Sequence, residues 1–449
     1  MNPSLFSPPA RFAAVLFVCL SLCLGAAAAT SETAPRQRAF PGAEGFGAYA
    51  KGGRGGKVLF VTNTNDTGPG SLREAIDTPG PRTVVFRVSG TIFLRSELKV
   101  THPFLTVAGQ TAPGDGICIK GHRFKIDAHD CIIRYIRVRM GDENRVAEDA
   151  IATYTGARDT IIDHCSASWA VDETISATNA KNVTVQWCII SESLNKSVHP
   201  KGSHGYGSLI NGEEVTYHHN LYAHHSDRVP RPAACLLDFR NNALYDFGGG
   251  GYNHAEATRM NYVGNYIIPQ EGRITSFSIR KPYGPVNLTK IFFANNYNAG
   301  SKEATDDNRK LLRVIESAGS PHDVILRQPI DIPAEYRVKT ETPHKAYERI
   351  LAEAGATLPK RDPVDTRIVE EVKARKGKII NAPSEVGGYP EYNSAAPPAD
   401  ADEDGMADEW ETKHSLSPKS ATDGNQDADQ DGYTNLEEFL NGTDPRTKN

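Results

Sequence analysis

The sequence predicts an all-β fold, a right-handed parallel β-helix or solenoid, followed by helices and a small acidic module at the C-terminus. Three observations predict it. Short segments rich in β-branched residues recur between about residues 80 and 300, separated by Gly, Asn and Asp. Two amphipathic helical patterns begin near residue 344, and two acidic loops of the same form follow residue 399.

The strand-like segments resemble one another and align on one position. They read TIIDHCSAS, VTVQWCIIS, VTYHHNLYA, LDFRNNALY, MNYVGNYII and KIFFANNYN, and the shared position holds Cys165, Cys188, Asn220, Asn242, Asn265 and Asn296. The separations are 23, 32, 22, 23 and 31 residues. A period of about 22 residues is what a solenoid coil of three strands and three bends requires. A β-sandwich with coincidental spacing is the alternative.

The repeated Asn and the two longer coils lead to further expectations. An inward Asn amide can hydrogen-bond its copies in neighbouring coils, so we expect an Asn ladder. The longer coils, residues 188–220 and 265–296, mark loops that leave the solenoid. Because binding sites occur on loops held by a rigid scaffold, we expect the functional site beside one of them.

Two helices are expected after the strands. HKAYERILAEAG, residues 344–355, has an apolar stripe that ends at Gly355, and DTRIVEEVKARKG, residues 365–377, has one that ends at Gly377. The stripes contain Ala346, Tyr347, Ile350, Leu351 and Ala354, and then Ile368, Val369 and Val372. We expect both helices to pack on or near the end of the solenoid.

The N-terminus has the pattern of a cleaved export signal. Arg11 precedes an apolar run over residues 12–24, and small residues follow at 26–29. The run is shorter than the ~20 residues that span a bilayer, which disfavours a retained membrane anchor. We therefore expect a secreted or periplasmic protein without membrane insertion. The predicted division is residues 1–29 signal peptide, 30–343 parallel β-helix, 344–392 helical extension on the solenoid, 393–399 linker and 400–449 acidic module.

The number and positions of the cysteines indicate their oxidation state. Five cysteines follow the predicted signal peptide: Cys118, Cys131, Cys165, Cys188 and Cys235. An odd number scattered through strand-like segments predicts buried thiols, with one oxidised pair, Cys118 and Cys131, as the alternative.

Charge is distributed unevenly. Residues 400–449 hold 14 acidic and 4 basic side chains, a net of −10, which leaves +5 for the rest of a chain whose total is −5. A mildly basic body predicts an anionic partner, and the acidic tail predicts a cation. Nucleic acid is disfavoured as that partner, because no segment resembles a nucleic-acid module and the export signal argues against it. We expect a monomer.

The acidic tail contains two loops with the spacing of EF-hand calcium sites. In DADEDGMADEWE and DADQDGYTNLEE, oxygen donors stand at the ligand positions and a Gly allows the sharp bend. The predicted ligands are Asp400, Asp402, Asp404, Met406, Asp408 and Glu411 in the first loop, and Asp427, Asp429, Asp431, Tyr433, Asn435 and Glu438 in the second. We expect a small α-helical, EF-hand-like module that binds Ca²⁺, with a solvated acidic tail as the alternative. Its role would be a stabilising clamp, a docking tether to another protein or a spacer.

Motifs in the middle of the chain resemble a known family. EDAIATYTGARDTIIDHCSASWAVDETIS, NKSVHPKGSHGYGSLI and VTYHHNLYAHHSDRVPRP, within about residues 148–234, resemble the active-site region of family 1 pectate lyases. AFPGAEGFG and NDTGPGSLREAI resemble N-terminal segments of these enzymes. The resemblance covers roughly residues 39–300 and, more loosely, the helices to about residue 390. The IDH, NK and R-x-P-R elements are specific in combination.

The resemblance implies a calcium-dependent pectate lyase that cleaves α-1,4-linked polygalacturonate by β-elimination, giving unsaturated oligogalacturonides. Such an enzyme removes a ring proton beside a carboxylate that a bridging cation polarises. The implied catalytic residues are Arg228, the base, and Lys196, which holds a substrate carboxylate. The implied calcium ligands are Asp149 and Asp172, with Glu173 compensating for Ser176 at the family's third acidic position. Arg231 matches a motif arginine, and Ala233 stands at the last one, with Arg240 or His199 as the expected substitute contact.

An arginine base imposes a condition. Because a guanidinium stays protonated far above neutral pH, it must be desolvated beside other cations, and we expect a preference for alkaline pH. Six histidines also lie near the proposed cleft: His199, His204, His218, His219, His224 and His225. They are compatible with a transition-metal site, acid–base groups or a substrate contact. Since neighbours on a strand point to opposite faces, we expect one of each tandem pair in or near the solenoid wall.

Three other functions stay open at this point. A β-helix glycoside hydrolase would use two or three carboxylates, for which Asp149, Asp163 and Asp172 are candidates, although Asp163 is better explained as support for a bend. A non-catalytic carbohydrate-binding solenoid with calcium-stiffened ends would not need the lysine–arginine pattern. Ser176 leaves open a calcium-independent enzyme for methyl-esterified pectin.

Overall fold

The structure is a computed structural model and describes residues 36–271, 275–282, 289–314 and 321–449. The predicted signal peptide, residues 1–29, lies outside the described residues. The architecture below belongs to the compact unit Gln37–Asn449. Among the described residues, no helix has the length and apolar character needed to cross a membrane.

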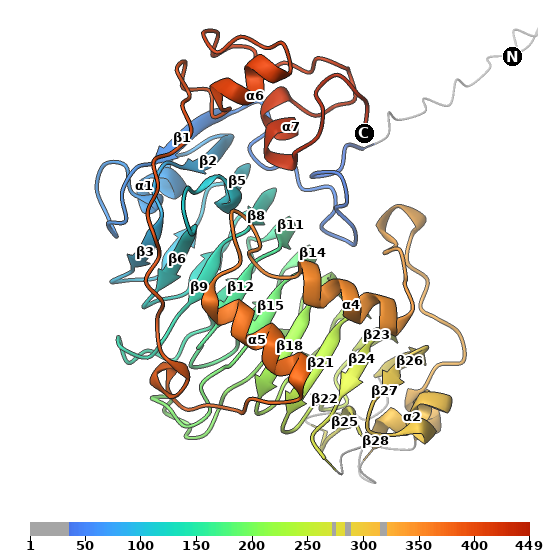
Figure 1. Cartoon of the computed structure of the whole chain (residues 1–449). Helices are drawn as coiled ribbons and strands as arrows, with labels where there is room; N and C mark the ends of the chain where they lie inside the picture. The colour runs from blue at the N-terminus through green and yellow to red at the C-terminus, as the bar shows by residue number, and fades with distance from the viewer. Residues whose placement is uncertain (1–35, 272–274, 283–288, 315–320) are drawn as a thin grey trace, which may run out of the picture. The chain divides into compact units, whose positions relative to one another are not determined.

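The described strands form parallel sheets that wind into a β-helix, as the repeat predicts (Figure 1). Sheet 1 contains β1 (Lys57–Val61), β2 (Arg82–Phe86), β5 (Leu105–Ala108), β8 (Cys131–Arg134), β11 (Arg158–Asp163), β14 (Lys181–Gln186), β17 (Glu213–His218), β20 (Leu236–Arg240), β23 (Arg259–Val263) and β26 (Lys290–Ala294). Sheet 2 contains β3 (Gly90–Phe93), β6 (Ile117–Lys120), β9 (Arg137–Arg139), β12 (Ser166–Ser168), β15 (Ile189–Ser191), β18 (Leu221–His225), β21 (Ala243–Phe247), β24 (Tyr266–Ile268) and β27 (Tyr297–Asn298). Sheet 3 contains β4 (Leu98–Val100), β7 (Phe124–Ile126), β10 (Ile151–Thr153), β13 (Ile175–Ala177), β16 (Leu209–Ile210) and β19 (Arg231–Pro232), and sheet 4 contains β22 (Gly251–Asn253), β25 (Phe277–Ile279) and β28 (Leu312–Val314).

Each middle coil passes from sheet 3 to sheet 1 to sheet 2, as in β10, β11 and β12, and then β13, β14 and β15. Neighbouring coils stay in register, so that Val183 pairs with Val215, and Val215 with Leu237. These three side chains have no exposed surface, which places the core inside the coils. The five described cysteines are free and buried, as predicted.

The bend between sheets 1 and 2 contains the predicted Asn ladder. The first residue of each bend has a left-handed backbone, with φ of 52° at Trp187 and 54° at His219. The side chain of the residue that follows is buried inside the coil. Asn220 Nδ2 donates to Asn242 Oδ1 (3.0 Å), and Asn242 Nδ2 donates to Asn265 Oδ1 (3.2 Å). Asn265 donates in the same way to Asn296 (2.9 Å). The ladder confirms the prediction and satisfies amides that would otherwise be unpaired in the core.

The N-terminal segment of this unit crosses the outer face of sheet 1. The Gly47 amide donates to Thr184 Oγ1 (2.8 Å), and Ala39, Phe40 and Ala43 belong to an apolar cluster on this face. A Cβ atom on Gly47 would lie 2.1 Å from the carbonyl oxygen of Thr160, so only glycine fits this close approach.

Helices α4 (Pro343–Glu353) and α5 (Pro363–Ala374) confirm the two predicted helices. Ile350 of α4 and Ile368 of α5 pack against outward side chains of sheet 2, among them Ile189 and Leu221. The helices therefore lie along the side of the coil stack, and not at its end where we expected them, because sheet 2 has an apolar outer face (Figure 1). Short helices occupy connections: α1 (Leu72–Asp77), α2 (Lys302–Asp306), α3 (Pro321–Val324), and the 3-10 helices η1 (Gly109–Thr111), η2 (Asn308–Leu311), η4 (Ala334–Tyr336) and η5 (Pro383–Val386). Helices α6 (Asp408–Lys413) and α7 (Asn435–Asn441) follow the acidic loops.

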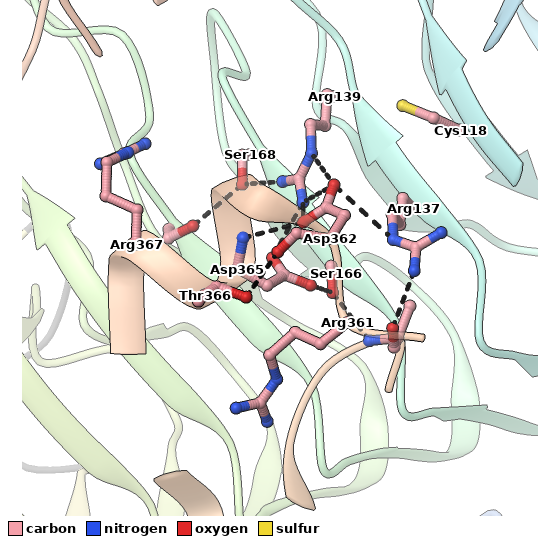
Figure 2. A network of polar contacts seen from close by, with 12 residues as sticks. Cys118, Arg137, Arg139, Ser166, Ser168, Arg361, Asp362, Asp365, Thr366 and Arg367 are labelled. Carbon is pink, nitrogen blue, oxygen red and sulfur yellow. Dashed lines mark hydrogen bonds and ion pairs between the residues drawn. The ribbon is translucent and has the colours of Figure 1, made fainter. Parts of the chain in front are cut away.

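Figure 2 shows the buried charges that hold the N-terminus of α5 on sheet 2. Arg139 of β9 has no exposed surface, and its Nη2 lies 2.8 Å from Asp362 Oδ2 and 2.9 Å from Asp365 Oδ1. Asp362 also caps α5, since its side chain accepts from the Asp365 amide. Burial acts to raise the pKa of Asp362, but the charge of Arg139 outweighs it and lowers that pKa to about 2. The pairing offsets the desolvation cost of both charges.

His224 of β18 holds the other end of α5. Its Nδ1 lies 2.6 Å from Asp246 Oδ2, and its Nε2 lies 3.3 Å from Glu371 Oε2. Burial acts to lower the pKa of His224, but the hydrogen bonds to the two carboxylates outweigh it and raise that pKa to about 9. The charged ring therefore ties α5 to sheet 2.

We expect Asn242→Ala to destabilise the coil stack. The change removes the acceptor used by the Asn220 side chain and the donor to the Tyr217 carbonyl, both in the interior. Unpaired buried polar groups should lower the free energy of unfolding by about 2–4 kcal/mol, measured by chemical denaturation. Asn65→Ala, in an exposed loop after β1, is the control. Equal stability of the two variants would contradict a structural role for the ladder.

We expect the stability contributed by His224 to disappear at alkaline pH. Its folded pKa is raised, so the contribution is complete below the unfolded value of about 6.5 and is lost as the pH rises through about 9. The difference in unfolding free energy between the wild type and His224→Gln should fall by about 3 kcal/mol between about pH 6 and pH 10. A difference that stays constant over this range would show that the charge of His224 does not hold α5.

Candidate active site

Four predicted site residues lie at the same end of sheet 3. Asp149 precedes β10, Asp172 and Glu173 precede β13, and Arg228 precedes β19. Parallel bridges join Glu173 to Tyr206 and Tyr206 to Asp227, so the residues before each strand stack in successive coils. The coil period thus brings together side chains that lie far apart in the sequence.

Three acidic side chains form one cluster. Asp149, Asp172 and Glu173 each have a carboxylate oxygen within 4.8 Å of the others. Burial and the charge of Asp172 raise the pKa of Asp149 to about 7, although Ser176 hydrogen-bonds Asp149. Oδ1 of Asp172 and Oε1 of Glu173 are buried and face the side chains of His204 and Arg228. Hard oxygen ligands that repel one another fit a divalent cation such as Ca²⁺.

Arg228 faces the acidic cluster. Its Nη1 forms an ion pair with Glu173 Oε1, and its Nε donates to the Tyr252 hydroxyl (3.2 Å). Its guanidinium lies 4.3 Å from the centre of the Tyr206 ring. The backbone is left-handed, with φ of 59°, a strain of about 1–3 kcal/mol that persists where surrounding contacts over-determine the conformation. The side chain is 19% exposed, so a bound molecule can reach it.

Two histidines contact Asp172. The rings of His199 and His204 stack at 3.6 Å, and His204 Nε2 lies 2.7 Å from Asp172 Oδ1. Burial acts to raise the pKa of Asp172, but the hydrogen bond and charge of His204 outweigh it and lower that pKa. His199 Nδ1 accepts from the Lys201 amide (3.1 Å), so in the neutral ring the proton is on the nitrogen that faces Asp172. The pair supports Asp172 through these contacts, and ligand atoms of the three side chains lie within 4.8 Å of one another, so a transition-metal site stays a prediction. Buried His199 is a poor candidate for the predicted substrate contact.

In the chain, Lys196 precedes the two histidines and Arg231 follows Arg228. Lys196 is exposed in the long loop between β15 and β16, and its amide donates to Asn381 Oδ1 (3.0 Å). Arg231 of β19 pairs with Glu256 (3.0 Å), and both line a hollow of about 620 Å³ at the other end of sheet 3. The longer coil, residues 188–220, supplies Lys196 and both histidines.

Several predicted residues lie elsewhere. Arg240 is in β20 of sheet 1, bound to Asp238 (2.8 Å) and Thr340 (2.9 Å), so the structure removes it from the predicted substrate contacts. Asp163 is buried in β11 between Arg134 and Gln186 and supports the wall, as expected. Both members of each tandem histidine pair are buried, and not only one: His218, His219, His224 and His225.

Sequence reasoning missed the side chains around Arg228. Besides Tyr206, they include Tyr252 and Arg280, whose guanidinium lies 3.6 Å from the Tyr252 ring centre and pairs with Asp227 (2.8 Å). The repeat contained a usable signal, because Tyr206 and Asp227 follow Glu173 by one and two coils. Extending the alignment of coils to these positions would have placed them beside the cluster.

The first C-terminal loop gathers four carboxylates, but not all of the predicted ones. Asp402, Asp404, Glu411 and Asp423 each have an oxygen within 4.8 Å of the others. Of the other predicted ligands, Asp408 accepts from the Ala401 amide (2.8 Å), Asp400 pairs with Arg87 (3.0 Å), and the Met406 side chain is buried. Burial and the neighbouring carboxylates raise the pKa of Glu411 to about 8 and that of Asp404 to about 6.

The second loop gathers three of its six predicted ligands. Asp427, Asp429 and Asp431 lie within 4.8 Å of one another. Tyr433 lies beside Arg54, Asn435 donates to the Asp423 carbonyl, and Glu438 accepts from Asn449 (2.8 Å). Burial raises the pKa of Glu438.

Known proteins resemble this chain over nearly its whole length. A probable pectate lyase C of Aspergillus terreus is 35% identical over 446 residues, which cover 97% of this chain and 99% of that protein. A probable pectate lyase C of Aspergillus oryzae is 36% identical over 417 residues, 91% of this chain and 94% of that one. No family model matches the chain.

Solved structures support the fold. A pectate lyase from Bacillus sp. N165 in complex with trigalacturonate aligns with a TM-score of 0.51 and 17% identity, covering 70% of this chain and 98% of that one. The cedar pollen allergen jun a 1 aligns with a TM-score of 0.53 and 17% identity, covering 70% and 92%.

The parallel β-helix and the similarity over full length define this protein as a polysaccharide lyase. Within that class, the chain belongs to the pectate lyase family.

Proposed function

We propose that this protein cleaves α-1,4-linked polygalacturonate by calcium-dependent β-elimination, with the cluster beside Arg228 as its active site. The observation that carries the proposal is the contact of Glu173 with Arg228, which joins a candidate cation site to a reachable guanidinium. The related pectate lyases, and the trigalacturonate in one similar structure, support a uronate polymer as the substrate. Export through the N-terminal signal and action as a monomer complete the proposal.

Each side chain then has a defined task. Asp149, Asp172 and Glu173 hold calcium, which when bound withdraws charge from a substrate carboxylate. Lys196 neutralises a substrate carboxylate from the exposed loop. Arg228, in its neutral form, takes the proton from the ring carbon beside that carboxylate. The electron pair left behind forms a double bond to the next ring carbon, and the glycosidic oxygen leaves and takes a proton from water.

Glu173 has a special place, because it belongs to both the carboxylate cluster and the Arg228 ion pair. The ion pair occupies the guanidinium, so this pair must open before Arg228 can take a proton from the substrate. Engagement of Glu173 by the cation and an alkaline medium both favour opening. The proposal therefore includes an alkaline preference.

The geometry fits hydrolysis less well. Glycosidases place two carboxyl groups on opposite sides of the scissile bond, roughly 5–9.5 Å apart. Here Asp149 and Asp172 share one cluster with oxygens within 4.8 Å, and Asp163 is buried in sheet 1. Three clustered carboxylates also favour a calcium requirement despite Ser176 at the family's third acidic position.

The C-terminal loops are proposed as further, EF-hand-like calcium sites. Both carboxylate oxygens of Asp402 and of Glu411 are buried and accept no hydrogen bond from the described residues. Oxygen donors left without partners in this way fit Ca²⁺.

We expect purified protein to form unsaturated uronide ends from polygalacturonate only when calcium is present. Ultraviolet absorbance of the new double bond should rise with calcium and stay flat with a chelator, because the carboxylate cluster then lacks its cation. Circular dichroism at the same chelator concentration controls for unfolding. New reducing ends without absorbance would identify a hydrolase instead.

We expect Arg228→Ala to lower kcat by about 10²–10⁴-fold, because a general base is lost. Arg240→Ala is a matched control, since Arg240 is 16% exposed and Arg228 19%, and each pairs with a carboxylate. Arg240→Ala should retain activity on polygalacturonate. Near wild-type turnover by a folded Arg228→Ala protein would show that another group takes the proton.

A further inference from the structure

The first C-terminal loop contributes to a cluster of carboxylates whose members differ from the ligands of the EF-hand pattern. Asp423 joins Asp402, Asp404 and Glu411, although it lies outside both loops. Glu411 has no exposed surface, Asp404 is 4% exposed and Asp423 is 8% exposed. Each has a buried oxygen without a hydrogen-bond partner among the described residues. Buried carboxylates aimed at one another without donors call for a divalent cation with oxygen preference.

Asp423 is held in place for this task. Its Oδ2 accepts from the Ser417 amide (3.0 Å), which leaves Oδ1 free, and its carbonyl accepts from Asn435 at the start of α7 (2.8 Å). A Cβ atom on Gly424 would lie 2.6 Å from Asp404 Oδ2, so the chain passes close to the cluster at this glycine. The site therefore ties together the first loop, α6 and the segment that leads to α7.

The same module lies against the first coil of the β-helix, where Figure 1 shows α6 and α7 near β1 and β2. A Cβ atom on Gly405 would lie 3.0 Å from Val58 of β1, and Asn425 donates to the Gly56 carbonyl (3.4 Å). Arg54 binds both oxygens of Glu437 (2.9 Å each), and Arg87 pairs with Asp400 (3.0 Å). The contact between the module and the first coil is thus electrostatically complementary, because the arginines belong to the β-helix and the carboxylates belong to the module.

The first coil needs such a cover. β1 is the terminal strand of sheet 1 and pairs only with β2 among the described strands. A terminal strand exposes unpaired backbone groups and has a neighbour on one side only, so solenoids require a cap.

We propose that a calcium ion held by Asp402, Asp404, Glu411 and Asp423 locks the C-terminal module onto the first coil and so protects the N-terminal end of the β-helix. The inference rests on the proposed calcium binding by the C-terminal loops and adds a ligand and a role. The module acts within its own chain, because Glu437 and Asp400 are engaged with Arg54 and Arg87.

The test is hydrogen exchange of the β1 amides, Lys57–Val61, in full-length protein freed of metal and then given CaCl₂. Calcium should slow exchange at least tenfold in the wild type and in Glu409→Gln, which removes an exposed charge from α6. Asp423→Asn should lose this protection and bind one calcium fewer by calorimetric titration. Arg54→Ala should keep the calcium but lose much of the protection. Asp172→Asn, changed in the active-site cluster, should keep the full effect at β1.

The outcomes separate the two proposals. If Asp423→Asn loses a calcium but calcium never protects β1 in the wild type, the lock is wrong and calcium binding by the loop stands. If Asp423→Asn binds and protects like the wild type, the assigned ligand set is wrong and the lock falls with it. If charge-removing variants of both loops leave the calcium stoichiometry unchanged, calcium binding by the module and the lock are both overturned.

Discussion

The stacking of each coil on the next in unbroken register is the constraint on which this structure depends. Parallel pairing fixes Val183 against Val215 and Val215 against Leu237, and the Asn ladder repeats that registration at the bend. A coil cannot lengthen within a strand without moving all of its side chains to the other face. Extra residues therefore enter only at bends. The long coil between Cys188 and Asn220 follows this rule, and the residues it adds include Lys196 and bring His199 and His204 to Asp172.

The same constraint explains which features could be predicted from the sequence. The recurring Asn and the apolar stripes of α4 and α5 are local periodic signals, and the structure confirms both. Periodicity along the chain does not report which sheet a residue joins, so Arg240 was grouped with Arg228 although it lies in sheet 1. Periodicity also does not show which sheet has an apolar outer face. That face is what places the two helices along sheet 2. Asp423 was missed because its partners come from a folded cluster and not from a twelve-residue spacing.

Two clusters of carboxylates have similar ligand chemistry but different surroundings. The cluster at sheet 3 lies beside Arg228 and the stacked histidines. Arg228 is partly exposed, so the side chain that pairs with this cluster can also reach a bound molecule. The C-terminal cluster consists of four carboxylates, three of which are buried. The C-terminal cluster has buried oxygens without hydrogen-bond donors among the described residues, whereas the cluster at sheet 3 is in direct contact with the cationic side chain of Arg228. That difference supports a catalytic role for one and a structural role for the other.

The contact of the C-terminal module with the first coil has a consequence for biosynthesis. The residues that cover the first coil are made long after it, because Glu437 follows its partner Arg54 by 383 residues. During translation and any passage across a membrane, the nascent solenoid must therefore present an uncovered edge strand, a state prone to association with other chains. A prematurely terminated chain would keep that edge permanently. Synthesis of the C-terminal module thus closes the end of the β-helix that is made before the other coils.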